Sequence, residues 1–363
     1  MRKSFASIPV LTPGYCPQTA ADLPGISIVV AARNEEYGIE RCIRSLLTLD
    51  YPDYEIIVVN DGSTDKTPQI LEELKKVNAR LKIIHNPELK KGWMGKQNAL
   101  DAGSSTADKK WLLFTDGDII FHKDSLKKAA QYAIDKKADS FGLIPLFLSG
   151  SFWEHVILAV AFFGAVFELA PRKISAGQEN AEKSVGAGAF NLIKKDVYRK
   201  LGGHEPIKQD VIDDIALANL VRTNGYRAFF ASAPQLLRVR MYRNFAELCS
   251  GLGKNAYASI GNKPVFLITV SLSMFCLFVV PSLVLLIPAL HSPLNIGMCI
   301  AAYIIACFTT LYTKKLAQFN GAAVLLHPVA MIIILSILLY SSMNALFKKE
   351  IVWRGRRFKL ENK

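Results

Sequence analysis

In the first half of the chain, short apolar runs alternate with amphipathic stretches. The runs Ile26–Ala31, Ile56–Val59 and Leu81–Ile84 contain few polar residues, as in strands that are buried on both faces of a parallel sheet. Between the first two runs, apolar residues recur at the spacing of one helix face, and Pro52 ends that stretch. Another apolar run, Trp111–Thr115, leads directly into Asp116. This alternation predicts an α/β fold built on a doubly wound, Rossmann-like mixed sheet.

The pattern is less regular after residue 140. Ser140–Leu146 predicts a strand and Asp210–Asn224 predicts a helix, and two closing strands are expected at Arg227–Ala231 and Leu236–Arg240. We therefore expect an N-terminal segment at residues 1–25 and one α/β domain at residues 26–240.

Long apolar segments dominate the rest of the chain. Pro264–Leu290, Leu294–Tyr312 and Ala322–Phe347 are each long enough and sufficiently free of charge to cross a membrane. The basic, aromatic segment 241–263 precedes them and predicts a helix at the surface of an anionic bilayer. Trp153–Leu169 is apolar but short for a span, which favours a buried or membrane-lying helix. We expect a transmembrane region of about three helices at 264–347 and a basic tail at 348–363.

The basic residues create a conflict in this membrane topology. Lys314 and Lys315 place the loop before the last apolar segment on the cytoplasmic side. Three crossings would then put the basic tail outside, against the positive-inside rule. His327-Pro328 offers an alternative, because a break there would leave two true spans and one re-entrant or interfacial helix. Hydropathy favours three spans.

Composition and net charge limit the kinds of molecule that this chain is expected to bind. The 363 residues are 51% hydrophobic and carry a net charge of +13, and the mean hydropathy is +0.22. This charge fits nucleic acid, an anionic membrane or phosphorylated substrates, but no nucleic-acid-binding motif is present. The six cysteines form no metal-type or redox-type pair, as in a reduced compartment. Residues 1–25 contain no signal-peptide core, so we expect the α/β domain to be cytoplasmic.

Asp116-Gly117-Asp118 follows the most apolar strand of the predicted sheet. Ligands of open α/β sheets bind at the carboxyl ends of the strands, where these two carboxylates lie. A lone Asp-x-Asp is more typical of a solvated turn. Glu35 and Asp61, however, also follow predicted strands, and Asp213-Asp214 opens a later helix. Carboxylates gathered in one cleft predict a divalent cation, Mg²⁺ or Mn²⁺, that holds phosphate oxygens.

Taken in order, these motifs resemble the family 2 glycosyltransferases with the GT-A fold. The resemblance covers about residues 26–240 and rests on several segments: 31–36 (AARNEE), 60–65 (NDGSTD), 95–100 (GKQNAL), Asp116-Gly117-Asp118, Gly202-Gly203 and 213–217 (DDIAL).

The resemblance implies a role for each matched residue. Asp61 would accept a hydrogen bond from uracil, Asp118 and Asp116 would hold the donor diphosphate through the metal, and Asp214 would deprotonate the acceptor. Asp213 is the alternative base, or it stabilises the helix start through the helix dipole. The remaining nucleotide-binding positions would be Ala31, Arg33, Glu35, Lys96 and Asn98.

Shorter motifs resemble the membrane glycosyltransferases of hopanoid and carotenoid pathways. They are 92–96 (GWMGK), 240–243 (RMYR), 253–255 (GKN) and 352–356 (VWRGR). Those relatives often carry an additional N-terminal span and a proline where this chain has Ala31. Further positions on the acceptor side are weaker candidates with structural alternatives: Trp93, Gly186, Gly188, His204, Arg240 and Arg243.

These observations predict a membrane-anchored, inverting glycosyltransferase that uses a nucleotide sugar, most simply a UDP-sugar, and a lipid acceptor. Adjacent apolar and interfacial segments would bring the cleft to the bilayer surface. Two alternatives remain: a processive polysaccharide synthase, and a membrane scaffold that binds a nucleotide sugar without turnover.

Overall fold

The computed structural model describes residues 8–17, 22–169, 188–260, 264–315, 317–348, 350–353 and 356–359. The chain divides into two compact units. The sheet unit comprises Met1–Leu146 and Leu169–Val239, and the helical unit comprises Phe147–Glu168 and Arg240–Lys363. The apolar segment predicted at 153–169 thus belongs almost entirely to the helical unit.

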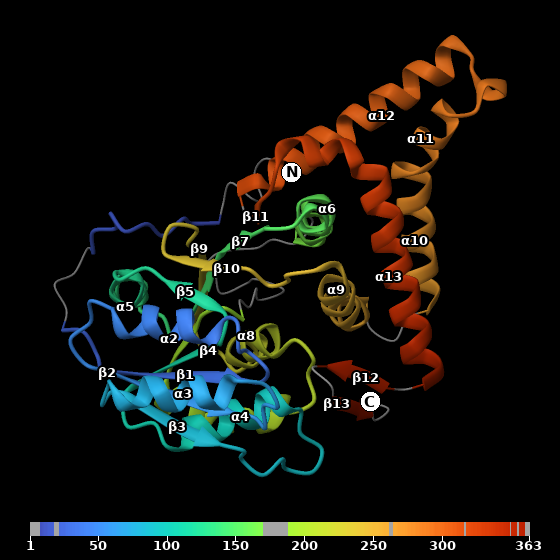
Figure 1. The fold of residues 1–363 in the computed structure, drawn as a ribbon. Coiled ribbons are helices and arrows are strands. Elements are labelled where there is room, and N and C mark those ends of the chain that lie inside the picture. The colour runs from blue at the N-terminus through green and yellow to red at the C-terminus, as the bar shows by residue number, and fades with distance from the viewer. Residues whose placement is uncertain are drawn as a thin grey trace. The chain divides into compact units, whose positions relative to one another are not determined.

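A seven-stranded mixed sheet forms the centre of the sheet unit, in the order β3-β2-β1-β4-β8-β6-β9 (Figure 1). The first four strands are parallel, whereas β8 runs antiparallel to both of its neighbours, β4 and β6. The predicted mixed α/β sheet is therefore confirmed. The strands are β1 (Ile26–Ala32), β2 (Tyr54–Asn60), β3 (Leu81–His85), β4 (Trp111–Asp116), β6 (Ser140–Ile144), β8 (Asn191–Lys194) and β9 (Ala228–Ser232).

Helices connect and cover these strands. They are α2 (Ile39–Leu47), α3 (Thr67–Lys76), α4 (Gly95–Ser105), α5 (Ser125–Asp135), α7 (Lys195–Lys200) and α8 (Asp213–Thr223), with a short 3₁₀ turn, η1, at Glu205–Ile207. The short strands β5 (Ile119–Phe121), β7 (Leu146–Leu148) and β10 (Leu237–Val239) lie outside the main sheet. The stretch predicted as one strand at 140–146 is divided between β6 and β7 at Pro145, which has no N–H to donate.

Close packing fixes α4 on the sheet. A Cβ atom at Gly103 would lie 2.4 Å from Val29 Cγ1 and 3.0 Å from Val59 Cγ2, so a larger residue would push the helix away. Leu100 of α4 is buried in the same apolar cluster as these valines and Leu217 of α8. This contact determines where the first turn of α4 meets the carboxyl edge of the sheet.

The helical unit contains α6 (Phe152–Leu169), α9 (Phe245–Ile260), α10 (Pro264–Phe278), α11 (Val280–Leu285), α12 (Pro293–Tyr312) and α13 (His327–Lys348). Shorter elements are η2 (Pro288–Leu290), η3 (Thr313–Lys315), β11 (Ala317–Gln318), η4 (Gly321–Leu326), β12 (Glu350–Trp353) and β13 (Arg356–Lys359). Within the described ranges, three helical stretches are long and apolar enough to cross a membrane: Ile268–Leu285, Pro293–Leu311 and Gly321–Met343. This is the number that hydropathy predicted.

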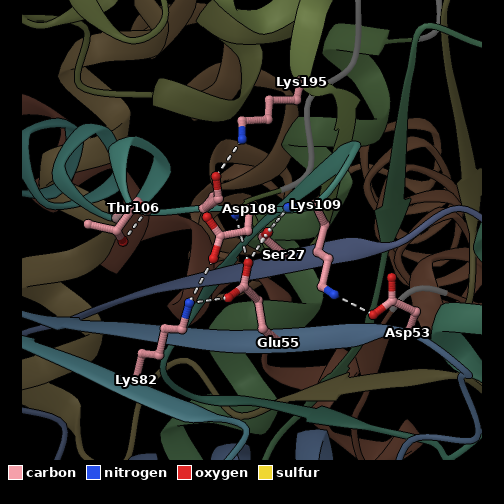
Figure 2. A network of polar contacts seen from close by, with 10 residues as sticks. Ser27, Asp53, Glu55, Lys82, Thr106, Asp108, Lys109 and Lys195 are labelled. Atoms are coloured by element: carbon pink, nitrogen blue, oxygen red, sulfur yellow. Dashed lines mark hydrogen bonds and ion pairs between the residues drawn. The ribbon is translucent and has the colours of Figure 1, made fainter.

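A charge network around the buried Glu55 lies at the amino ends of β1 and β2, opposite the predicted site (Figure 2). Glu55 Oε1 accepts hydrogen bonds from Ser27 Oγ at 2.6 Å and from the Asp108 N–H at 2.8 Å. Lys82 Nζ lies 2.7 Å from Glu55 Oε2 and 3.0 Å from Asp108 Oδ2. Burial alone would raise the pKa of Glu55, but these donors lower it below its usual value. Glu55 is therefore a structural anion.

We expect Glu55→Gln to lower the free energy of unfolding by about 2 kcal/mol at pH 7, because a buried hydrogen-bonded charge is lost. The depressed pKa in the folded state means that this contribution is complete above the ordinary pKa of 4.5 and disappears as the pH falls through the folded value. Thermal unfolding in detergent at pH 7 and pH 4 measures it. Exposed Glu73→Gln is the matched control. An equal deficit at both pH values would contradict the assignment.

Candidate active site

The loops that follow β1 and β2 are hydrogen-bonded to each other. Arg33 Nη1 donates to the carbonyl oxygens of Asp61 at 2.5 Å and Gly62 at 3.1 Å. Asn34, which has a positive φ of 53°, accepts from the Thr64 N–H at 2.8 Å through Oδ1. Its neighbour Glu35 donates its backbone N–H to Thr67 Oγ1 at 2.9 Å. The structure therefore brings the loops that carry Arg33, Glu35 and Asp61 together.

The turn at the end of β4 packs against the first of these loops. A Cβ atom at Gly117 would lie 3.4 Å from Glu35 Cγ, and one at Gly38 would lie 3.3 Å from the Cα of Asp118. Ala31 is paired with Asp116 in the β1–β4 register. Both aspartates are half-buried. The backbone therefore places the Asp-Gly-Asp turn beside Glu35.

Lys96 lies among carboxylates that come from two other elements. Its Nζ is 2.8 Å from Asp116 Oδ1 and 3.0 Å from Asp213 Oδ1, and its side chain is 16% exposed. Burial alone would lower the pKa of Lys96, but Asp116, Asp213 and Asp214 raise it well above its usual value. The lysine is therefore charged. It links the first turn of α4 to the first turn of α8, where both Asp213 and Asp214 lie.

Asp214 has the environment of a base. Burial, followed by the negative charge of Asp213, raises the pKa of Asp214 to about 6, against the opposing effect of Lys96. A carboxylate with a pKa near 6 can accept a proton at neutral pH more effectively than an ordinary aspartate.

Gly188 lies close to two of these carboxylates, Asp116 and Asp214. A Cβ atom there would lie 3.3 Å from Asp116 Oδ2 and 3.6 Å from Asp214 Oδ2. A larger side chain would crowd both groups. Gly186, the neighbouring candidate, lies outside the described residues.

The candidate metal ligands at this edge of the sheet are Asp116 and Asp118. No group of three or more His, Cys, Asp or Glu side chains with metal-site geometry occurs among the described residues. Mg²⁺ and Mn²⁺ sites that hold phosphates, however, commonly use one or two carboxylates, with phosphate oxygens and water as the remaining ligands. The half-buried Asp116 and Asp118 offer such a pair.

Asn98 holds the loop that precedes α4, and Gln97 contacts the segment that precedes α8. Asn98 Nδ2 donates to the Glu88 carbonyl at 3.0 Å, and its Oδ1 accepts from the Lys90 N–H at 3.3 Å. Gln97 Nε2 donates to the Asp210 carbonyl, while Gln97 Oε1 is buried without a hydrogen-bond partner in the described part of the chain. Asn98 was expected to line the nucleotide pocket, and the structure places its amide on this loop. Sequence reasoning assigned no role to Gln97.

Two other candidates are packed in the interior. Trp93 is 6% exposed, with Lys90 Nζ 4.5 Å from its ring centroid. His204 is 1% exposed, and its Nδ1 lies 2.6 Å from the Tyr198 hydroxyl. Burial lowers the pKa of His204 to about 4, so the ring is neutral. Both residues are buried. A role in packing, which was the alternative to a functional role, accounts for their positions.

Arg240 and Arg243 belong to the helical unit. Arg240 makes a bidentate pair with buried Glu154, through Nε at 3.0 Å and Nη2 at 2.8 Å. Burial alone would raise the pKa of Glu154, but the donors from Arg240 and from the backbone at 150–151 lower it to about 2. The backbone N–H of Arg243 donates to Glu247 Oε2 at 3.0 Å, at the start of α9. Sequence reasoning missed Glu154, although Ser151-x-x-Glu154 is a capping-box pattern.

Comparison with known proteins identifies sequences that are similar to this chain. Residues 27–202 match the family described as Glycosyl transferase family 2. The 4,4'-diaponeurosporenoate glycosyltransferase of Staphylococcus aureus (strain USA300) is 22% identical over 344 residues, covering 92% of this chain and 88% of the relative. These matches confirm the resemblances to the family and to its carotenoid-pathway members.

One solved structure supports the fold. The mannosyltransferase PcManGT from Pyrobaculum calidifontis, in complex with GDP-Man and Mn²⁺, aligns with a TM-score of 0.55 and 17% identity, covering 93% of this chain and 92% of that one. S. aureus TarS 1–349 in complex with UDP aligns more weakly, with a TM-score of 0.44 and 16% identity over 92% and 95% of the two chains. The first alignment and the family match confirm the predicted GT-A fold.

We expect Lys96→Met to lower the free energy of unfolding by about 3 kcal/mol, because it leaves the clustered, partly buried carboxylates without their counter-charge. The deficit should be larger at pH 8 than at pH 5, where protonation relieves the repulsion. Thermal unfolding at both pH values measures it, with exposed Lys91→Met as the matched control. A deficit that is independent of pH would show that Lys96 does not neutralise this cluster.

Proposed function

Because residues 27–202 form a family 2 glycosyltransferase domain, we propose that the chain transfers a sugar from a nucleotide sugar to a lipid acceptor. The carrying observation is the position of the half-buried Asp214 carboxyl close to Asp116 and Lys96, where burial and the charge of Asp213 raise its pKa to about 6. In the proposed reaction Asp214 takes the proton of the acceptor hydroxyl or carboxyl group. The acceptor oxygen then forms a bond to the anomeric carbon as the bond from that carbon to the diphosphate breaks. A single displacement inverts the anomeric configuration.

The proposed roles of Asp116, Asp118 and Lys96 follow from where these residues lie in the site. Asp116 and Asp118 would hold a divalent cation, Mg²⁺ or Mn²⁺, with Asp118 as the more direct ligand. That ion, when bound, stabilises negative charge on the departing diphosphate. Lys96 contributes a permanent positive charge beside the same leaving group. The structural neighbour in complex with GDP-Man and Mn²⁺ is consistent with a metal-dependent nucleotide-sugar donor.

The donor base is assigned to the loops after β1 and β2. Asp61 would accept the imide N–H of uracil, which favours a UDP-sugar, while Arg33 holds the loop that carries Asp61. Ala31 and Glu35 would lie beside the nucleoside. Asn98 would act indirectly, by holding the loop at 88–90.

The lipid acceptor is proposed from two features. A relative that aligns over most of both chains is named for glycosylation of 4,4'-diaponeurosporenoate. The helical unit adds three stretches that are apolar and long enough to cross a membrane. We place the protein in the cell membrane as a multi-pass protein, with the sheet unit on the cytoplasmic side.

Membranes that contain the protein, supplied with radiolabelled UDP- and GDP-sugars and Mg²⁺ or Mn²⁺, test this function. Label should partition into organic solvent and disappear when a chelator is added. Label in long water-soluble chains would instead indicate a polysaccharide synthase. Donor binding without any product would indicate a non-catalytic scaffold.

The rate of transfer should rise with pH through about 6, because Asp214 must be deprotonated to act as a base. Asp214→Asn should retain donor binding and lose about 10²-fold or more in rate. Initial rates from pH 5 to pH 8 and titration with nucleotide measure these effects, with exposed Asp196→Asn as the control. Full activity in Asp214→Asn would move the base assignment to Asp213.

Asp118→Ala should abolish the enhancement of UDP binding by Mg²⁺ or Mn²⁺, because a carboxylate ligand of the ion is lost. Isothermal titration with and without the metal compares the variant with Asp196→Ala. An unchanged metal dependence in Asp118→Ala would remove Asp118 from the proposed metal site.

A further inference from the structure

Gln97 is a buried amide with one polar atom left unpaired. It lies in the first turn of α4, between Lys96 and Asn98, and is 2% exposed. Its Nε2 donates to the Asp210 carbonyl, whereas its Oε1 is buried and accepts no hydrogen bond from any described residue. An unsatisfied buried acceptor is costly, and an apolar side chain of similar length would fill the space without that cost. Packing alone therefore does not explain an amide at this position. What the amide adds is the contact with Asp210.

The backbone that Gln97 contacts connects η1 with α8. Residues 208–212 in this connection form neither a helix nor a strand. Two hydrogen bonds reach it from the start of α4 and the residue before that helix. The Met94 N–H donates to the Lys208 carbonyl at 2.9 Å, and Gln97 Nε2 donates to the Asp210 carbonyl. Of these two contacts, the one from Gln97 lies nearer to α8.

The start of α8 lacks a side-chain cap. Ile212, the residue before the helix, has no polar side-chain atom and makes no cap hydrogen bond. Asp213 and Asp214 form the first turn directly after it. Their carboxylates are therefore placed by contacts that reach the start of the helix from other segments.

Two consecutive residues of α4 act on this part of the chain in different ways. Lys96 Nζ lies 3.0 Å from Asp213 Oδ1 and 2.8 Å from Asp116 Oδ1, so it contacts side chains. A lysine side chain is long and flexible and can follow a carboxylate that moves. Gln97 contacts the backbone three residues before Asp213. Lys96 therefore balances the charge of the carboxylates, and Gln97 restrains the chain that carries them.

The position of Asp214 affects its use as a base. A Cβ atom at Gly188 would lie 3.6 Å from Asp214 Oδ2 and 3.3 Å from Asp116 Oδ2, so the surroundings of both carboxylates are close. A base must lie within hydrogen-bond reach of the proton that it takes, and a displacement of about 1 Å can cost about 10²-fold in rate. Movement of the first turn of α8 would therefore lower turnover.

We propose that Gln97 is a positioning residue for the base. Its amide holds the Asp210 backbone, and through that backbone it keeps Asp214 within reach of the acceptor oxygen. Gln97 itself contacts no reacting atom. This inference rests on the proposed function, in which Asp214 takes the proton of the acceptor.

Amide hydrogen exchange of the purified full chain in detergent, measured by mass spectrometry, tests this support without requiring turnover. Gln97→Met keeps a side chain of similar length and removes the donor, so exchange across residues 208–216 should become faster by about tenfold or more. Gln131→Met in α5 is the matched control, because Gln131 Oε1 is also buried without a partner among the described residues. The control should leave exchange across 208–216 unchanged. Unchanged exchange in Gln97→Met would overturn the proposal, whether or not the chain is active.

A double-mutant cycle with Asp214→Asn tests whether Gln97 acts through the base. Gln97→Met should lower kcat by about tenfold or more and leave the affinity for UDP with Mg²⁺ unchanged. It should have no further effect on the residual rate of Asp214→Asn. If Gln97→Met does not fold, Gln97→Asn, whose amide is one methylene shorter, replaces it in both experiments.

An equal loss of rate in both backgrounds would overturn the proposal, because Gln97 would then act independently of Asp214. A parallel loss of UDP affinity would also overturn it, because Gln97 would then support the donor site. A parent chain that binds UDP but forms no product with any donor would overturn the proposed function, and the positioning role with it, even where the exchange result stands.

Discussion

The need to neutralise carboxylates that are crowded at one edge of the sheet governs the arrangement of the sheet unit. Asp116 arrives from β4 and Asp213 from the first turn of α8, and Lys96 from the first turn of α4 contacts both. An unpaired charge in a partly buried position is costly, so these contacts favour the relative position of the three elements. The close approach of α4 to the sheet at Gly103 and the link from Gln97 to the Asp210 backbone maintain it.

Glu55 and Asp214 show that two carboxyl groups in different surroundings have opposite pKa shifts. Glu55 is surrounded by donors that lower its pKa, so it remains an anion and joins strands. Asp214 is half-buried, and its burial together with the neighbouring carboxylate of Asp213 raises its pKa, so it can exchange a proton near neutral pH. The surroundings of Glu55 keep it ionised in a structural role, whereas those of Asp214 leave it able to accept a proton.

The sequence was sufficient to predict the parallel half of the sheet and the place where its acidic residues gather. Apolar runs report buried strands, and a polar residue directly after such a run is placed at the carboxyl edge by the geometry of the sheet. Contacts between segments that are distant in the sequence could not be predicted from local patterns. The antiparallel insertion of β8, the attachment of Asn98 to the loop at 88–90 and the pair of Arg240 with Glu154 depend on partners that no local pattern identifies. Charged and amide side chains outside strand ends were therefore the hardest to assign.

The position of β8 within the sheet affects how the chain is made. β8 lies between β4 and β6 and bonds to both, yet it follows α6 in the sequence. While the ribosome is still translating, the sheet cannot close until the apolar α6 has already emerged. That helix therefore leaves the exit tunnel before the sheet is complete, and an exposed apolar segment in an unfinished fold is prone to aggregate. Early delivery of the nascent chain to a membrane would protect it, which makes the order of strands in the sheet a constraint on biosynthesis as well as on shape.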